Sequence, residues 1–107
     1  ERCPLSAADF YQVLETADVP NGVVNSVTGA RETLAKTLAD HDNVDAVWVF
    51  GTAGTSMLAE KLSAGNMKRT WVDYGIGREW LDAEQGAGED FLMEATQVKN
   101  IWVPTGE

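Results

Sequence analysis

The feature that most constrains the fold is the stretch Ala46–Ser56, which reads AVWVFGTAGTS. An unbroken apolar run at 46–50 is typical of a parallel strand covered on both faces, because a strand with one wet face alternates instead. A turn of Gly, Thr and Ser follows, and Met57, Leu58 and Leu62 then mark an amphipathic helix. A strand that feeds a helix through such a turn is the unit of α/β proteins, and turns of this kind often hold phosphates.

The flanking patterns predict more helices and strands of the same kind. Apolar residues at helical spacing predict a helix that begins near Pro4, a second at 32–40 and a short third at 89–95. Strands that alternate with helices favour a parallel sheet with helical crossovers. Besides 46–50, the strands that we expect are Val23–Val27, Lys68–Tyr74 and a terminal strand, Val98–Val103.

Composition and charge narrow the class of partner. With 107 residues and 44% hydrophobic content, the chain can build one small core. Its net charge of -9 repels phosphate backbones and anionic lipids, so we expect neither nucleic acid nor a membrane as partner. A single cysteine, Cys3, excludes an internal disulfide and suits the reducing cytoplasm, and with one histidine, His41, it argues against a structural zinc site. The chain starts without Met and without a secretory signal, as a fragment would.

Four short segments, in register, resemble one known family. ERCPL at the start is similar to the end of a Lys-Pro-Ser-Glu-x-x-Pro-Leu stretch, and Pro20–Gly29 is close to PPGVVNVVTG. Val44–Thr52 (VDAVWVFGT) is similar to VDxVxFTGS, and Ala64–Arg69 (AGNMKR) to AGNLKR. Together they resemble the NAD(P)-binding domain of the aldehyde dehydrogenase superfamily. The resemblance implies a partial Rossmann-like parallel sheet, flanked by helices, over residues 1–75.

The last third resembles a different part of the same family. Gly75–Glu79 (GIGRE) and Ala95–Val103 (ATQVKNIWV) are similar to SGIGRE and YTQVKNVWV, which lie at the far C-terminus of full-length members. In those members the last strand serves oligomerisation. Because the two matched parts follow each other directly in this chain, the resemblance implies that the catalytic domain between them is missing here. This arrangement resembles the shortened C-terminal module of the two-module, family-sixteen aldehyde dehydrogenases. It implies a second region, residues 76–107, with a Gly-rich connector, a short helix and an oligomerisation strand.

This chain lacks the cysteine nucleophile that the resemblance implies for the catalytic reaction of the family. The resemblance implies a cysteine some tens of residues after Asp73, but no cysteine follows Asp73 at all. Asp73 stands where the family has its general base, a Glu, and is one methylene shorter. Arg78 and Glu79 are candidate ion-pair partners for Asp73 or for each other, and Cys3 is best explained as a small packing residue. We therefore expect no catalytic residue in this chain, although the resemblance is to an NAD(P)-dependent enzyme family.

The turn at 51–56 leaves two interpretations of cofactor binding open. Gly51 matches the first glycine of the family's GSTxxG turn, whereas Ser56 replaces the last one and Gly54 comes two residues early. The favoured interpretation is that hydroxyl side chains such as Thr52 cap the next helix. The alternative is a residual NAD site in which Gly51 and Thr52 approach the pyrophosphate and Glu1 bonds the adenosine ribose.

Two functions follow from these patterns. The first is a non-catalytic scaffold that joins a second copy, or a companion aldehyde dehydrogenase module, by strand addition. The second is an NAD(P)-binding module that assists a separate active site. The assembly residues expected in the first case are Val98, Ile101, Trp102 and Val103.

Overall fold

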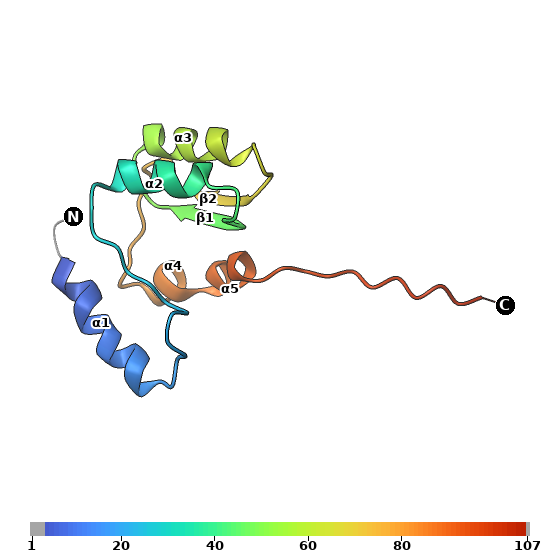
Figure 1. Ribbon diagram of the computed structural model, residues 1–107, viewed down its shortest axis with the longest axis horizontal. Helices are drawn as coiled ribbons and strands as arrows, with labels where there is room; N and C mark the ends of the chain where they lie inside the picture. The colour runs from blue at the N-terminus through green and yellow to red at the C-terminus, as the bar shows by residue number, and fades with distance from the viewer. Residues whose placement is uncertain (1–3, 107) are drawn as a thin grey trace.

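The computed structural model describes residues 4–106 and places five helices and two strands in that range (Figure 1). The two strands pair in parallel, with Trp48 opposite Trp71 and Val49 opposite Val72. The parallel strand pair predicted at 46–50 and 68–74 is therefore confirmed, as is the helix between the two strands, with each strand shorter than expected. In chain order the elements are α1 (Pro4–Thr16), α2 (Arg31–Asp40), β1 (Ala46–Val49), α3 (Ala53–Ser63), β2 (Arg69–Val72), α4 (Ala83–Ala87) and α5 (Glu89–Ala95). The predicted alternation does not extend to the rest of the chain, where α1 is followed by α2 and α4 by α5.

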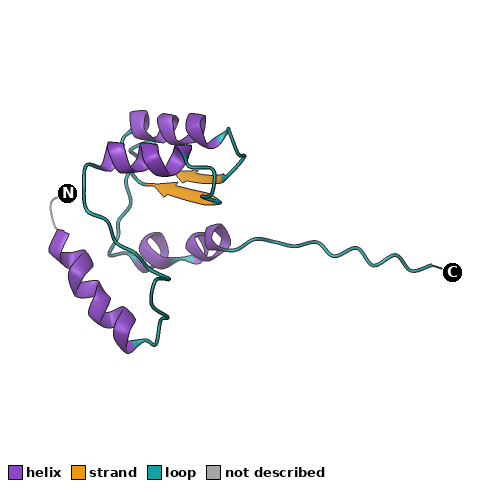
Figure 2. Ribbon diagram, in the orientation of Figure 1, coloured by secondary structure: helices purple, strands orange, loops and turns teal. Residues whose placement is uncertain are grey.

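One face of the sheet is covered by α2 and α3, which lie side by side on it (Figure 2). Val47 and Val49 of β1 point to this face because residues two apart in a strand share a side. They meet small helical side chains, which let the helices approach the strands closely. The buried core consists of Ala35, Ala39, Val47, Val49 and Ala59, with Leu62 and Val72 packed against it.

The other face of the sheet is aromatic and is covered by α4 and α5 (Figure 2). Trp48 and Trp71 meet edge to face at 5.1 Å between ring centroids, and Phe91 of α5 lies 4.8 Å from Trp71. Phe50 joins the cluster at 5.1 Å from both Trp71 and Trp80. Such T-shaped contacts stabilise by about 0.5–1.5 kcal/mol per pair beyond the buried area. This aromatic cluster fastens the C-terminal segment to the sheet.

Two consecutive cationic residues at the start of β2, Lys68 and Arg69, each donate hydrogen bonds to the C-terminal end of one helix. Lys68 is buried, and its ammonium donates to the carbonyl oxygens of Ala39, in the last turn of α2, and of His41, the residue that follows the helix, both at 2.7 Å. Arg69 donates to the carbonyl oxygens of Glu94 and Thr96 at the end of α5. Neighbouring residues of an extended chain point to opposite sides, so one cation serves each face. Both satisfy carbonyls that a helix C-terminus leaves unpaired.

The N-terminal helix stands apart from the sheet (Figure 1). It contacts the turn that follows it, where the Tyr11 hydroxyl accepts a hydrogen bond from the Ser26 N–H at 2.7 Å. The predicted strand Val23–Val27 is wrong, since these residues are irregular and exposed. A strand needs a hydrogen-bonded neighbour, and in the described chain β1 pairs with β2 alone.

The C-terminal tail leaves the body of the molecule as an extended segment (Figure 1). The predicted terminal strand Val98–Val103 is not formed in this chain, because residues 97–106 lie against no other strand. The Gly-rich connector predicted between β2 and α5 contains a short helix, α4, which was not predicted from the sequence. Asp82 caps that helix by accepting from the Gln85 N–H at 2.9 Å. None of the helices within residues 4–106 is long and apolar enough to cross a membrane.

Candidate functional site at the carboxyl edge of the sheet

The segments that follow β1 and β2 meet at one edge of the sheet. Parallel strands end on the same side, and ligand sites of open α/β sheets form outside this carboxyl edge. An open pocket of about 570 Å³ lies here. The residues that line it are Arg31, Phe50, Gly51, Thr52, Asp73, Gly75, Gly77, Arg78 and Trp80.

Asp73 ties the two segments together. Its carboxylate accepts hydrogen bonds from the backbone N–H of Gly51 at 2.9 Å and of Gly75 at 3.2 Å. Gly75 adopts a φ of +80°, and a Cβ at this position would lie 3.4 Å from the Gly51 carbonyl oxygen. A second tie is the hydroxyl of Ser56, fully buried in α3, which accepts from the Tyr74 N–H at 3.1 Å. The close approach and the positive φ explain why glycine occupies position 75.

The same hydrogen bonds set the charge of Asp73. Burial raises the pKa of this carboxyl, but hydrogen bonds from the backbone N–H groups of Gly51 and Gly75 outweigh it, and the pKa is lowered below 3.8. A carboxylate with a lowered pKa holds protons weakly at neutral pH, which is the opposite of what a general base needs. Asp73 therefore acts in this structure as an acceptor that positions two loops.

Two backbone donors of the turn after β1 are used within the chain. The Gly51 N–H already donates to Asp73, and the Thr52 hydroxyl caps α3 by accepting from the Thr55 N–H at 3.2 Å. A dinucleotide pyrophosphate needs free backbone donors here, and the ionised Asp73 would repel it. These two features weigh against a pyrophosphate at this turn. Glu1, the third residue predicted to contact NAD, lies outside the described residues, as does Cys3.

Arg78 belongs to the aromatic cluster rather than to Asp73. Its guanidinium lies 4.5 Å from the ring centroid of Trp71 and 5.2 Å from that of Phe91, and it pairs with Asp90 at 3.9 Å. The predicted pairing with Asp73 or Glu79 is wrong, because the rings and the first turn of α5 offer a closer fit. Trp80 lines the carboxyl-edge pocket, and Trp71 lines an adjacent one.

No metal site is assembled among the residues that the structure describes. Within residues 4–106 no three His, Cys, Asp or Glu side chains are grouped so as to hold a metal ion. The sequence did not predict the hydrogen bond between Asp73 and Gly51, which are 22 residues apart. It also did not predict the hydrogen bonds from Lys68 and Arg69 to the carbonyl groups of helix ends. The AGNMKR motif gave a signal for the second, since it places both cations at the start of a predicted strand.

Comparison with known proteins agrees with the resemblance seen in the sequence. The model of the Aldehyde dehydrogenase family matches residues 1–79. The chain therefore belongs to the aldehyde dehydrogenase family. No solved structure matches it significantly.

Several curated relatives align with much of the chain. It is 34% identical over 76 residues to the NADP/NAD-dependent aldehyde dehydrogenase PuuC of Escherichia coli, which covers 70% of this chain and 15% of the relative. It is 31% identical over 102 residues to a betaine aldehyde dehydrogenase of Rhizobium leguminosarum, covering 95% of this chain and 20% of the relative. The chain thus spans about 15–20% of the length of these two relatives.

Proposed function

We propose that the chain is a non-catalytic assembly module of an aldehyde dehydrogenase-like protein. Its sheet and helices form a scaffold, and its C-terminal tail joins a second copy of the chain. The module corresponds to the shortened C-terminal part of a two-module aldehyde dehydrogenase, with a partial Rossmann-like region at 1–75 and a connector, helix and assembly segment at 76–107. Cysteine usage, with one thiol in 107 residues, favours a cytoplasmic location.

The observation that carries this proposal is the exposure of the tail. The side chains predicted to serve assembly are exposed by 85% at Val98, 83% at Ile101, 91% at Trp102 and 73% at Val103. An extended apolar segment with unpaired backbone groups is the form that adds to a neighbouring chain. Four apolar side chains in six residues cost free energy in water and regain it when a partner covers them.

The catalytic role is disfavoured by what the chain lacks and by what Asp73 does. No cysteine follows Asp73, so this segment supplies no thiolate to attack a carbonyl. The residue at the position of the general base is held as a hydrogen-bond acceptor by Gly51 and Gly75. Both features leave packing and assembly as the roles that these residues can perform.

Sedimentation equilibrium of the intact chain and of a chain ending at Gln97 tests the assembly role. We expect the intact chain to populate a dimer at micromolar concentrations and the shortened chain to remain a monomer. Circular dichroism of the shortened chain checks that the helices persist, since the tail contributes to none of them. An equal mass for the two chains at every concentration would exclude assembly through the tail.

A second candidate, NAD(P) binding for a separate active site, has one observation in its favour. The carboxyl-edge pocket is lined by two arginines, Arg31 and Arg78, on the side of the sheet where α/β proteins bind ligands. Against it stand the Gly51 N–H, which Asp73 occupies, and the charge of Asp73. Tryptophan fluorescence during an NAD titration separates the two, because Trp80 lines the pocket. The scaffold proposal expects a flat titration, and a saturable change would favour the second candidate.

A further inference from the structure

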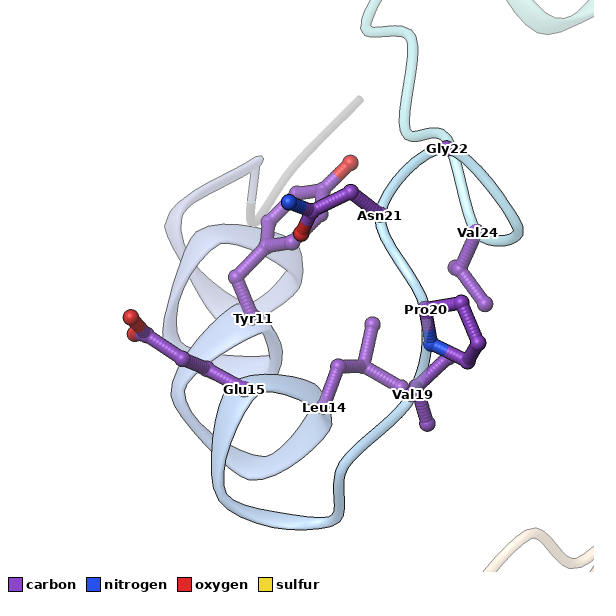
Figure 3. A pocket seen from close by; sticks show the side chains of 8 residues that line it. All are labelled: Tyr11, Leu14, Glu15, Val19, Pro20, Asn21, Gly22 and Val24. Atoms are coloured by element: carbon purple, nitrogen blue, oxygen red, sulfur yellow. The ribbon is translucent and has the colours of Figure 1, made fainter.

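We infer that the pocket between α1 and the turn after it receives Trp102 of a second copy. This inference rests on the proposed assembly function and deepens it by naming the acceptor site. The α1 pocket is defined by Tyr11, Leu14, Glu15, Val19, Pro20, Asn21, Gly22 and Val24 (Figure 3).

The α1 pocket has the shape and surface of an aromatic binding site. Leu14 points from the helix toward Pro20, and Val24 lies beside Pro20 on the turn that faces the helix (Figure 3). The open volume is about 210 Å³, enough for the side chain of one aromatic residue. The turn is braced by the hydrogen bond between Tyr11 and Ser26, so the pocket exists before anything enters it. A preformed apolar pocket lowers the ordering cost of binding.

Trp102 is the occupant that the chain itself provides. It is 91% exposed, on a tail that contacts no regular element of its own chain, and tryptophan is the commonest kind of anchor at protein interfaces. In one molecule the tail runs away from the body, on the side opposite to α1 (Figure 1). A second copy therefore presents the ring more readily than the same copy. A two-fold dimer would fill both pockets with both tails.

The charge of Glu15 at the edge of the α1 pocket also favours the tail of a second copy as the occupant. The Glu15 carboxylate lies on the outer side of the helix at the edge of the pocket (Figure 3). Lys99 is one of eight cationic residues in a chain of net charge -9, and it precedes Trp102 by three residues. Three residues of extended chain span roughly 10 Å, so Lys99 can reach the rim while the indole occupies the pocket. Because the chains otherwise repel each other, an opposite-charge pair at this point fixes which surfaces meet.

Charge-reversal variants of the full-length chain test the pocket separately from the tail. In sedimentation equilibrium we expect Glu15→Lys and Lys99→Glu each to raise the dimer dissociation constant by about two- to fivefold, the range of exposed ion pairs. The double variant should return to within about twofold of the original value, because the pair is restored in reverse. Asp9→Lys is the matched control, with the same charge change on the same exposed helix but away from the pocket.

Filling the pocket from within gives a larger effect. Val24→Trp places an indole where we expect the partner's ring, and it should raise the dissociation constant more than tenfold. Trp102→Ala should do the same, since it removes the anchor. Circular dichroism confirms that each variant keeps its helices.

The outcomes separate this inference from the proposed function. If Trp102→Ala abolishes the dimer while Val24→Trp and both charge reversals leave it unchanged, the tail assembles the protein at another surface and the α1 pocket is refuted. If the intact chain is a monomer at all concentrations, the proposed assembly function fails together with the inference. Restoration by the double reversal, with an inert Asp9→Lys, would support both.

Discussion

Buried apolar side chains occur within residues 31–95 and are absent from the described residues of the two ends, 5–30 and 96–106. In the middle, small residues such as Ala39 and Ala59 are almost fully buried, and large rings such as Phe91 pack against one another. At the ends, Leu5, Phe10 and Trp102 are exposed by 76%, 53% and 91%. The middle holds a packed core, although Ile76 and Leu81 in its connector are 88% and 103% exposed, whereas the ends present apolar surface without any core of their own in the described range. This difference supports the proposal that the ends of the chain serve assembly.

The largest effect that sharpens this comparison is expected at Lys68, inside the middle region. Lys68→Met removes the hydrogen bonds to Ala39 and His41 and leaves the buried Ala39 carbonyl and the part-buried His41 carbonyl unpaired. We expect a loss of about 2–3 kcal/mol in the free energy of unfolding, measured by urea denaturation. Lys61→Met, on the exposed surface of α3, is the matched control and should cost less than about 0.5 kcal/mol. Equal losses of unfolding free energy for both variants would contradict the stabilising role of the Lys68 hydrogen bonds.

A smaller effect is expected at Asp73, where the middle region holds its loops. The pKa of Asp73 is lowered in the folded chain, below 3.8, so its hydrogen bonds to Gly51 and Gly75 stabilise the fold above pH 3.8. That contribution is lost as the pH falls through the folded pKa. We expect the thermal midpoint to drop between pH 6 and pH 3, and to drop less in Asp73→Asn.

The control for this pH experiment is Asp9→Asn, at an exposed position on α1. We expect this variant to lose as much thermal stability between pH 6 and pH 3 as the original chain. An Asp73→Asn variant with an undiminished pH dependence would mean that Asp73 does not hold the loops.

The sequence predicted the middle region better than the ends for a physical reason. The helix predicted around Leu34 and Leu38 and the strand predicted from the apolar run of β1 are both present in the structure. The buried face of that helix consists of Ala35 and Ala39, whereas Leu38 is half exposed. Val23–Val27 and Val98–Val103 have the composition of strands, but a strand forms only where a neighbour completes its ladder. The composition of a segment can be seen in its sequence, whereas the neighbouring strand that it needs is determined by the fold or by the assembly.

The candidate site could be predicted only in part. The Thr52 cap follows from the hydroxyl residues at the start of a helical pattern, as expected. The contact from Asp73 to Gly51 joins two loops far apart in the sequence, and no local pattern encodes it. The α4 helix had a local signal that was overlooked, since Asp82 is a good N-cap three residues before Gln85.

Hydrogen–deuterium exchange of the intact chain, at concentrations below and above the dimer midpoint, tests the central claim most directly. We predict that amides of β1, α3 and β2 are protected at both concentrations, because the middle region folds alone. Amides of Val98–Val103 should exchange freely in the dilute sample and become protected in the concentrated one. Free exchange of this tail at both concentrations, or protection at both, would contradict the account.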